Sequence, residues 1–100
     1  TFINILTPCR LSWGIDPDQT VDIVREAVNS CYWPLYEVAD GRWQINYQPK
    51  EKSSYIDWLR RQNRFRHLFR PENTHLLAEL QAEVDRNWES ILRKCEMSLA

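Results

Sequence analysis

At 100 residues the chain can fill one small domain, and its 43% hydrophobic and 27% charged residues are typical of a folded protein. The net charge of −1 at pH 7 provides no long-range attraction to nucleic acid or to an anionic membrane surface. No apolar run approaches the roughly 18 residues that cross a bilayer, so we expect no membrane segment.

The three cysteines, Cys9, Cys31 and Cys95, are odd in number and far apart in sequence, which does not indicate a disulfide framework. The first residues lack the basic and apolar stretches of a secretory signal. We therefore expect a reducing, cytoplasmic environment.

The first predicted element is a strand over residues 2–7, which Pro8 ends. Its nearly continuous apolar side chains are typical of a strand buried on both faces of a parallel sheet. Such a sheet needs neighbouring strands and covering helices that the following sequence does not offer. Together with the absence of an initiator Met, this leads us to expect a fragment of a longer protein.

Residues 9–17 are predicted to form a loop, and a helix is predicted over 18–31. Val21, Val24, Val28 and Cys31 recur on it at helical spacing. The helix should stop near Tyr32, because Pro34 restricts the residue before it and has no backbone N–H.

The C-terminal two thirds predict a hairpin followed by helices. Alternating apolar residues flank Asp40-Gly41, which predicts a β-hairpin over 35–47. Ser53 or Ser54 should cap a helix that runs to about Gln62, and an apolar cluster follows it. Pro71 should open a long amphipathic helix whose apolar positions are Leu77, Leu80, Val84, Trp88, Ile91 and Cys95.

Few residues indicate chemistry on their own. No phosphate-binding loop, paired-cysteine metal motif or nucleophile elbow is present, and His67 and His75 lack metal-ligand spacing. Cys9 follows a predicted strand and a proline, where βα proteins often place functional groups, although a free cysteine is also a common core residue. Cys31 and Cys95 lie on apolar helical stripes and are expected in the core.

Residues 59–70 contain five of the thirteen basic residues, interleaved with aromatic side chains. Such a pattern can bind nucleic acid. The alternative is that these arginines pair with acidic groups on a neighbouring helix or subunit. Because the net charge is near zero and an acidic helix follows, the pairing interpretation is favoured.

Four segments, in order, resemble the β subunits of 2-oxoacid:ferredoxin oxidoreductases, a family similar to pyruvate:ferredoxin oxidoreductase. They are Thr7-Pro8-Cys9 with Trp13-Gly14, the helix at 18–31, Trp33-Pro34-Leu35-Tyr36-Glu37, and the segment 55–68 with Tyr55, Trp58, Leu59, Gln62, Arg64-Phe65 and His67-Leu68. The resemblance covers residues 2 to about 90. It departs from the family at residues 10–12, where Arg10, Leu11 and Ser12 replace the usual Pro and Gly.

The resemblance implies an α/β fold, the C-terminal part of a thiamine-diphosphate-binding fold. Residues 1–34 would end the cofactor-binding domain, 35–48 would form a hairpin, and 53–100 would be C-terminal helices. It also implies that Cys9 is one thiolate ligand of a 4Fe–4S cluster. The remaining cluster cysteines, and the residues that bind thiamine diphosphate and Mg²⁺, would lie outside this chain.

The implied activity is oxidative decarboxylation of a 2-oxoacid such as pyruvate, with coenzyme A as a further substrate and ferredoxin as electron acceptor. The implied partners are the remainder of the β subunit and the other subunits, with no nucleic acid and no membrane. This chain alone is not expected to be active. The competing interpretation is a small non-enzymatic interaction module that docks through its hairpin and its long amphipathic helix.

Overall fold

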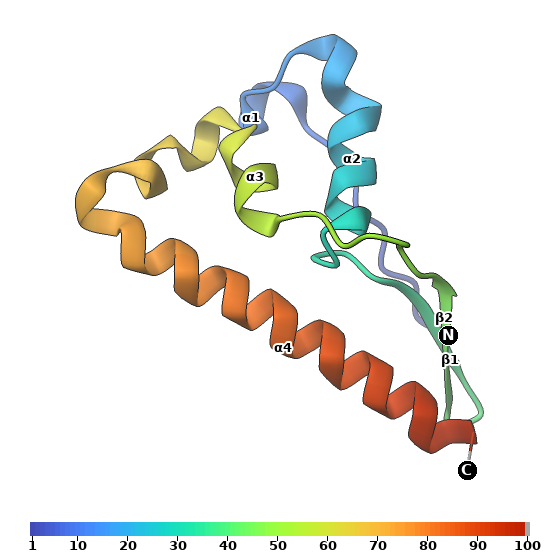
Figure 1. Cartoon of the computed structure of the whole chain (residues 1–100). Coiled ribbons are helices and arrows are strands. Elements are labelled where there is room, and N and C mark those ends of the chain that lie inside the picture. The colour runs from blue at the N-terminus through green and yellow to red at the C-terminus, as the bar shows by residue number, and fades with distance from the viewer. Residues whose placement is uncertain (100) are drawn as a thin grey trace.

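The computed structural model describes residues 1–99, in which a hairpin and three short helices face one long helix (Figure 1). The α-helices are α1 (Arg10–Trp13), α2 (Thr20–Asn29), α3 (Tyr55–Arg60) and α4 (Thr74–Leu99), and the strands are β1 (Leu35–Ala39) and β2 (Arg42–Tyr47). Segments of 3₁₀ helix cover Pro17–Gln19, Asn63–Phe69 and Pro71–Asn73. None of the helices within residues 1–99 combines the length and the apolar character that a bilayer crossing requires.

The strand predicted over residues 2–7 is not formed. This segment lies alongside the hairpin without strand pairing, and Phe2, Ile3 and Ile5 are each more than 70% exposed. A strand exists only where a neighbour accepts and donates its backbone hydrogen bonds. Among residues 1–99 the sheet contains β1 and β2 alone, so the apolar segment has no parallel partner.

The helix predicted over 18–31 is confirmed as α2, but the predicted apolar stripe is rotated from the buried face. Ile23 and Ala27 are fully buried, whereas Val21 is 64% exposed. α3 packs against the side of α2 that carries Ile23, so the neighbouring helix decides which apolar side chains are covered. After Asn29 the chain turns through Cys31, whose φ of 64° is left-handed, and the N–H of Trp33 donates to the Ala27 carbonyl at 3.0 Å.

The predicted hairpin is confirmed, with antiparallel β1 and β2 joined at Asp40 and Gly41. Both turn residues have positive φ, 52° and 76°, which matches the two-residue turn that the Asp-Gly pair favours. On one face the rings of Tyr36 and Trp43 stack with their centroids 5.4 Å apart. The hairpin is attached to the C-terminal end of α4, because the backbone N–H of Trp43 donates to the Ser98 hydroxyl at 3.0 Å.

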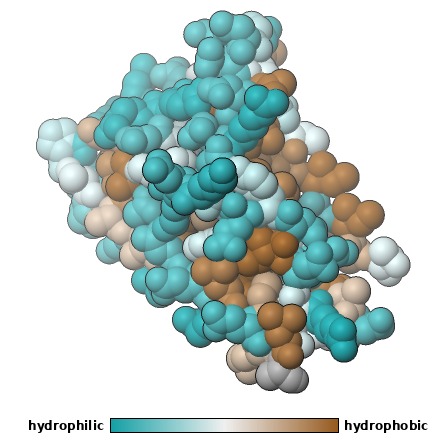
Figure 2. All heavy atoms as spheres, turned by 45° about the vertical axis from the view of Figure 1, so that its right-hand side comes forward, coloured by the Kyte–Doolittle hydropathy of each residue, from teal (hydrophilic) through white to brown (hydrophobic). Residues whose placement is uncertain are grey.

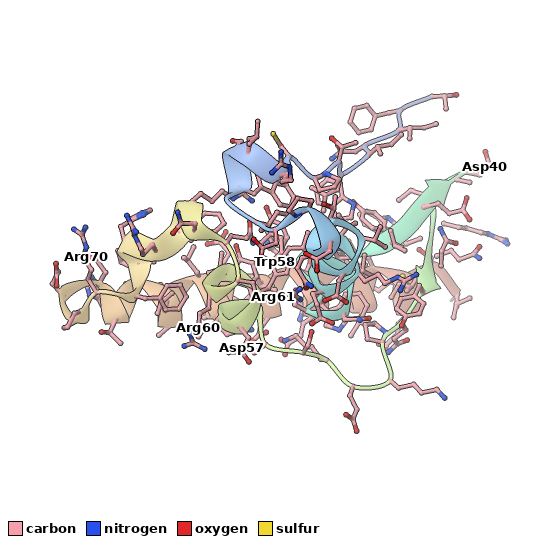
Figure 3. The ribbon with its side chains drawn as sticks, turned by 90° about the horizontal axis from the view of Figure 1, so that it is seen from above. Asp40, Asp57, Trp58, Arg60, Arg61 and Arg70 are labelled. Atoms are coloured by element: carbon pink, nitrogen blue, oxygen red, sulfur yellow. The ribbon has the colours of Figure 1, made fainter. Side chains whose placement is uncertain are left out.

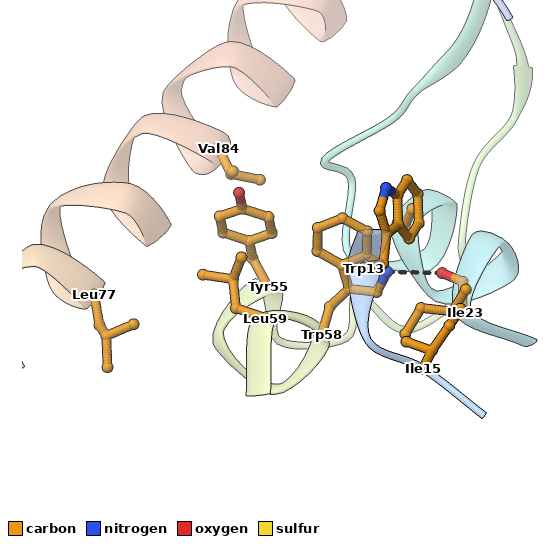
Figure 4. Close-up of a cluster of buried hydrophobic side chains, with 9 residues drawn as sticks. Trp13, Ile15, Ile23, Tyr55, Trp58, Leu59, Leu77 and Val84 are labelled. Atoms are coloured by element: carbon orange, nitrogen blue, oxygen red, sulfur yellow. Dashed lines mark hydrogen bonds between the residues drawn. The ribbon is translucent and has the colours of Figure 1, made fainter. Parts of the chain in front are cut away.

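The core lies between α1, α2 and α3 on one side and the first half of α4 on the other (Figure 4). Ser54 caps α3 by accepting a hydrogen bond from the Asp57 N–H, as the sequence predicted, and Tyr55, Trp58 and Leu59 are buried. The Trp58 indole N–H donates to the Ile23 carbonyl at 2.7 Å, which ties α3 to α2. The predicted apolar positions of α4 are confirmed at Leu77, Val84 and Trp88, which are buried.

The fold is therefore a mixture of helices with a two-stranded sheet, which is compatible with a fragment of an α/β protein. Buried residues that precede the hairpin in sequence, from Trp13 to Ala27, share one core with buried residues that follow it, from Tyr55 to Val84. Much apolar area nevertheless stays at the surface, visible as brown patches among hydrophilic atoms on the face in Figure 2. The exposed apolar side chains include Phe2, Ile3, Ile5, Leu11, Leu35, Tyr36, Val38 and Tyr47.

Candidate functional site

Cys9 lies where the extended N-terminal segment meets α1. Its backbone is extended, with φ −124° and ψ 100°, and it occupies the position before the first helical residue. The thiol is free and solvent-exposed. The sequence predicted an irregular loop from residue 9 to 17, and this was wrong for Arg10–Trp13, which form a single helical turn. So short a helix leaves almost no sequence periodicity by which to predict it.

Backbone contacts fix this turn in place. The Trp13 N–H donates to the Cys9 carbonyl at 2.8 Å, and Gly14 ends the turn with a left-handed φ of 68°. The Gly14 carbonyl then accepts a hydrogen bond from the Asn63 N–H at 3.3 Å. The turn that follows Cys9 is thus attached, at Gly14, to a residue 49 positions later in the chain.

Trp13 connects this turn with the hydrophobic core. Its side chain is 7% exposed, and its ring meets that of Trp58 edge to face, with centroids 6.1 Å apart. The guanidinium of Arg64 lies over the Trp13 ring, 4.2 Å from its centroid, and over the Phe65 ring at 4.5 Å. Stacking of this kind suits the planar guanidinium.

Gln62 holds Arg64 in that position. Gln62 is a buried polar residue, 1% exposed, and its side-chain oxygen accepts a hydrogen bond from Arg64 Nε at 2.8 Å. Its side-chain N–H₂ donates to the Trp58 carbonyl at 3.1 Å. Because both ends of the amide have a partner, the orientation of Gln62 is defined, and with it the orientation of Arg64.

Arg64 has no acidic partner in the described residues. Burial lowers the pKa of Arg64, while the neighbouring Tyr32, Tyr55 and Cys9 act in the opposite direction. Within residues 1–99 no carboxylate forms an ion pair with Arg64. The structure therefore places this guanidinium over Trp13, on the helical turn that follows Cys9, without a carboxylate to compensate its charge.

An aromatic stack lies beneath this cluster. The ring of Tyr32 stacks on those of Tyr55 and Trp58, with both centroid distances at 5.0 Å. Burial, with a smaller contribution from Tyr32, raises the pKa of Tyr55 to about 12, and Arg64 opposes the shift. Tyr55 is therefore a neutral packing residue at neutral pH.

The other histidines and cysteines considered from the sequence differ from Cys9 in exposure or in chemical surroundings. His67 and His75 are exposed, and no three His, Cys, Asp or Glu side chains of residues 1–99 are grouped as a metal site. Cys31 is buried, as predicted, and burial raises the pKa of its thiol. Cys95 is half-buried on α4. Of the three cysteines, Cys9 is the exposed one.

The arginine-rich segment is partly paired within the chain. Arg61 donates to Asp22 of α2 at 2.7 Å and to Gln19 at 2.8 Å. Arg60 pairs with Asp57 at 2.8 Å on the outer side of α3, and Arg70 lies well away from both (Figure 3). Two of the five arginines are therefore paired within the chain, as the pairing interpretation expects.

Sequence reasoning missed the roles of Trp13, Gln62 and Arg64 in this cluster. Gln62 and Arg64 were singled out only as members of a resembling motif, and no local spacing connects them with Cys9. A polar residue flanked by aromatic positions was the available signal, because a glutamine among core residues needs internal hydrogen-bond partners.

Comparison with known proteins found no matching family model. The sequence is 39% identical to the pyruvate synthase subunit PorB of Thermotoga maritima over 93 residues, which is 92% of this chain and 29% of that protein. It is 37% identical to PorB of Methanothermobacter marburgensis over 84% of this chain and 28% of that protein. It is 30% identical to the ketoisovalerate oxidoreductase subunit VorB of Pyrococcus furiosus over 97% of this chain and 30% of that protein.

Along most of its length the chain is therefore similar to part of subunits whose names assign them to oxidoreductases. More narrowly, the chain belongs to the family of 2-oxoacid:ferredoxin oxidoreductase β subunits, and the resemblance seen in the sequence is confirmed. It spans about 30% of the length of these relatives.

Proposed function

We propose that this chain is the C-terminal portion of a β subunit that oxidatively decarboxylates a 2-oxoacid and passes the electrons to ferredoxin. In this proposal Cys9 supplies one thiolate to a 4Fe–4S cluster. The residues that bind thiamine diphosphate and Mg²⁺, and the other three cluster ligands, lie in the remainder of the β subunit. The other subunits of the complex, the 2-oxoacid and coenzyme A are the further partners.

The observation that carries the proposal is the placement of Cys9. Its thiol is exposed and free, and backbone hydrogen bonds of Trp13 and Gly14 anchor the turn that carries it. A thiolate is the usual protein ligand of an Fe–S cluster. One exposed thiolate on an anchored turn fits the role of a single ligand among four.

The apolar extended segment supports placement within a larger subunit. Phe2, Ile3 and Ile5 expose large side chains that a parallel sheet would bury on both faces. In the proposal this segment adds a strand to the cofactor-binding domain, which would extend through residue 34. The hairpin at 35–48 and the helices at 53–100 then extend from that domain.

The chemistry divides between bound groups and protein. When bound, thiamine diphosphate supplies the decarboxylation chemistry and the cluster supplies one-electron transfer. The residues of this chain hold the ligand cysteine, exclude water on the Trp13 side and set the local charge. Since the relatives are named for pyruvate and for ketoisovalerate, we propose the substrate only as a 2-oxoacid of this class.

The test uses the complete oxidoreductase complex, purified without oxygen, with the Cys9→Ser change in its β subunit. We expect loss of one 4Fe–4S cluster per β subunit, measured as iron content and as the reduced-cluster EPR signal, and loss of ferredoxin reduction. The matched control is Cys95→Ser, which removes a half-buried thiol far from α1 and should leave iron unchanged.

Unchanged iron and ferredoxin reduction in Cys9→Ser would overturn the role of Cys9. The exposed apolar residues of the hairpin and the long helix would then favour the interaction-module alternative.

A further inference from the structure

Arg64 differs from the other stacked arginine of the same segment. Arg60 also lies over an aromatic ring, that of Phe69 at 5.0 Å, but it pairs with Asp57. Arg64 pairs with no carboxylate in residues 1–99 and is held by a neutral amide. Its positive charge is therefore not cancelled by an acidic neighbour in the described part of the chain.

The position of that charge is set by two connections. Gln62, buried and hydrogen-bonded at both ends, fixes Arg64 Nε, and the Trp13 ring supports the guanidinium from below. Trp13 in turn donates its backbone N–H to the Cys9 carbonyl. Trp13 therefore both stacks against the guanidinium and bonds the backbone of Cys9.

We propose that Arg64 is a positioning residue of the redox site, whose guanidinium holds a positive charge over Trp13, on the helical turn that follows Cys9, and raises the reduction potential of a cluster bound through that cysteine. This inference rests on the proposed function, because it takes Cys9 as a ligand. Reduction adds one negative charge to the cluster, and a fixed cation stabilises the more negative state. The potential of an Fe–S cluster follows such local charges and its exposure to solvent.

Two substitutions separate the charge from the geometry. Arg64→Gln removes the charge, whereas Arg64→Lys keeps it but loses the planar fork that bonds Gln62 and stacks on Trp13. The matched control is Arg60→Gln, which removes a stacked arginine whose charge Asp57 already compensates. Each variant is made in the complete complex, purified without oxygen.

The readouts are iron per β subunit and the midpoint potential of the cluster whose EPR signal disappears in Cys9→Ser. For Arg64→Gln we expect full iron and a lower midpoint potential. The expected change is about tenfold in the equilibrium constant for one-electron reduction, which corresponds to about 59 mV. Arg64→Lys should keep most of the wild-type potential, and Arg60→Gln should leave it unchanged.

The outcomes distinguish the two proposals. Iron retained in Cys9→Ser overturns the proposed function, whereas cluster loss in Cys9→Ser with an unchanged potential in Arg64→Gln overturns only the role of Arg64. If Arg64→Gln loses its iron, Arg64→Lys decides: full iron at the wild-type potential supports the inference. Loss of iron in both variants would assign Arg64 to folding and overturn the inference. A tenfold shift in Arg64→Lys, which keeps the charge, would show that the charge does not set the potential and would overturn it as well.

Discussion

Gly14 lies so close to Asn63 that a Cβ atom at position 14 would sit 2.5 Å from the Asn63 Cβ. This is closer than two carbon atoms can approach without movement of one of them. Gly14 also has a left-handed φ of 68°, which costs residues with a side chain about 1–2 kcal/mol. The close approach joins the turn that carries Cys9 to the segment that carries Gln62 and Arg64.

We therefore expect Gly14→Ala to lower the thermal midpoint of the β subunit and, under the proposed function, to reduce the content of the cluster that Cys9 would ligate. The control is Gly41→Ala, whose φ of 76° imposes the same backbone strain but whose added Cβ would meet nothing within 4 Å. Differential scanning calorimetry with iron analysis measures both effects. Equal destabilisation by the two substitutions would contradict the importance of the contact with Asn63.

A second prediction concerns the hydrogen bond between Trp58 and the Ile23 carbonyl. Trp58→Phe keeps an aromatic ring but removes the indole N–H, so the Ile23 carbonyl loses its bond from α3 and keeps only its bonding within α2. We expect a loss of about 0.5–1.5 kcal/mol in the free energy of unfolding from this hydrogen bond, measured by urea denaturation.

The matched control is Trp43→Phe, because the indole N–H of half-buried Trp43 has no acceptor among residues 1–99. A loss as large in the control as in Trp58→Phe would show that ring size, rather than the hydrogen bond, is responsible.

Thiol reactivity should separate Cys9 from Cys31. The thiolate is the reactive form, and burial raises the pKa of Cys31, so less thiolate is present at pH 8 than for an ordinary cysteine. Cys31 is also only 2% exposed. In the cluster-free β subunit we expect iodoacetamide to modify Cys9 faster by on the order of tenfold or more.

Mass spectrometry of digested protein at timed intervals measures the two rates. In urea-unfolded protein the rates should become similar, which provides the control. Equal rates in the folded subunit would show that the packing around Cys31 is not as described.

A pH-dependent contribution is expected from Asp85. The hydrogen bond from Lys52, with a smaller one from Gln81, lowers the pKa of Asp85 against the opposing effect of burial. Because the folded pKa lies below the unfolded one, the pair stabilises the fold above about pH 4 and loses its effect as the pH falls through the folded pKa. Both side chains are about a third or more exposed, so the contribution should be at most about 1 kcal/mol.

Asp85→Asn should thus be slightly less stable than wild type at pH 7 and equally stable near pH 2.5, measured by urea denaturation. The control, Glu83→Gln, alters a pair with Arg86 at 3.9 Å in which both side chains are more than 65% exposed, and should change nothing. A difference for Asp85→Asn that persists at low pH would contradict the assigned cause.

The sequence predicted those elements whose signal is local. Asp40-Gly41 between alternating residues is enough for the hairpin, and the repeat from Leu77 to Trp88 is enough for α4. The prediction of a strand at 2–7 was wrong because a strand is defined by its neighbours, and no neighbour for it lies in residues 1–99. The prediction of which face of α2 is buried was wrong because the packing of α3, rather than the pattern of valines, determines which side is covered.

For the site, the sequence could nominate Cys9 but not its surroundings. The partners of Cys9 are brought to it by contacts between Gly14 and Asn63 and between Trp13 and Arg64, about 50 residues apart. Periodicity carries no information over that separation, so only the folded chain shows that the motif around Gln62 belongs beside the cysteine.

The contacts at two distant points of α4 limit where residues can be inserted into this helix. The Gln81 side chain accepts hydrogen bonds from the first backbone N–H groups of α3, and Ser98, about 26 Å further along the helix, accepts one from the hairpin. One inserted residue between them would turn Ser98 by about 100° around the helix axis and away from Trp43. Variation in the length of this helix should therefore be confined to its ends, because any change between Gln81 and Ser98 alters both the phase and the reach at which the hairpin is attached.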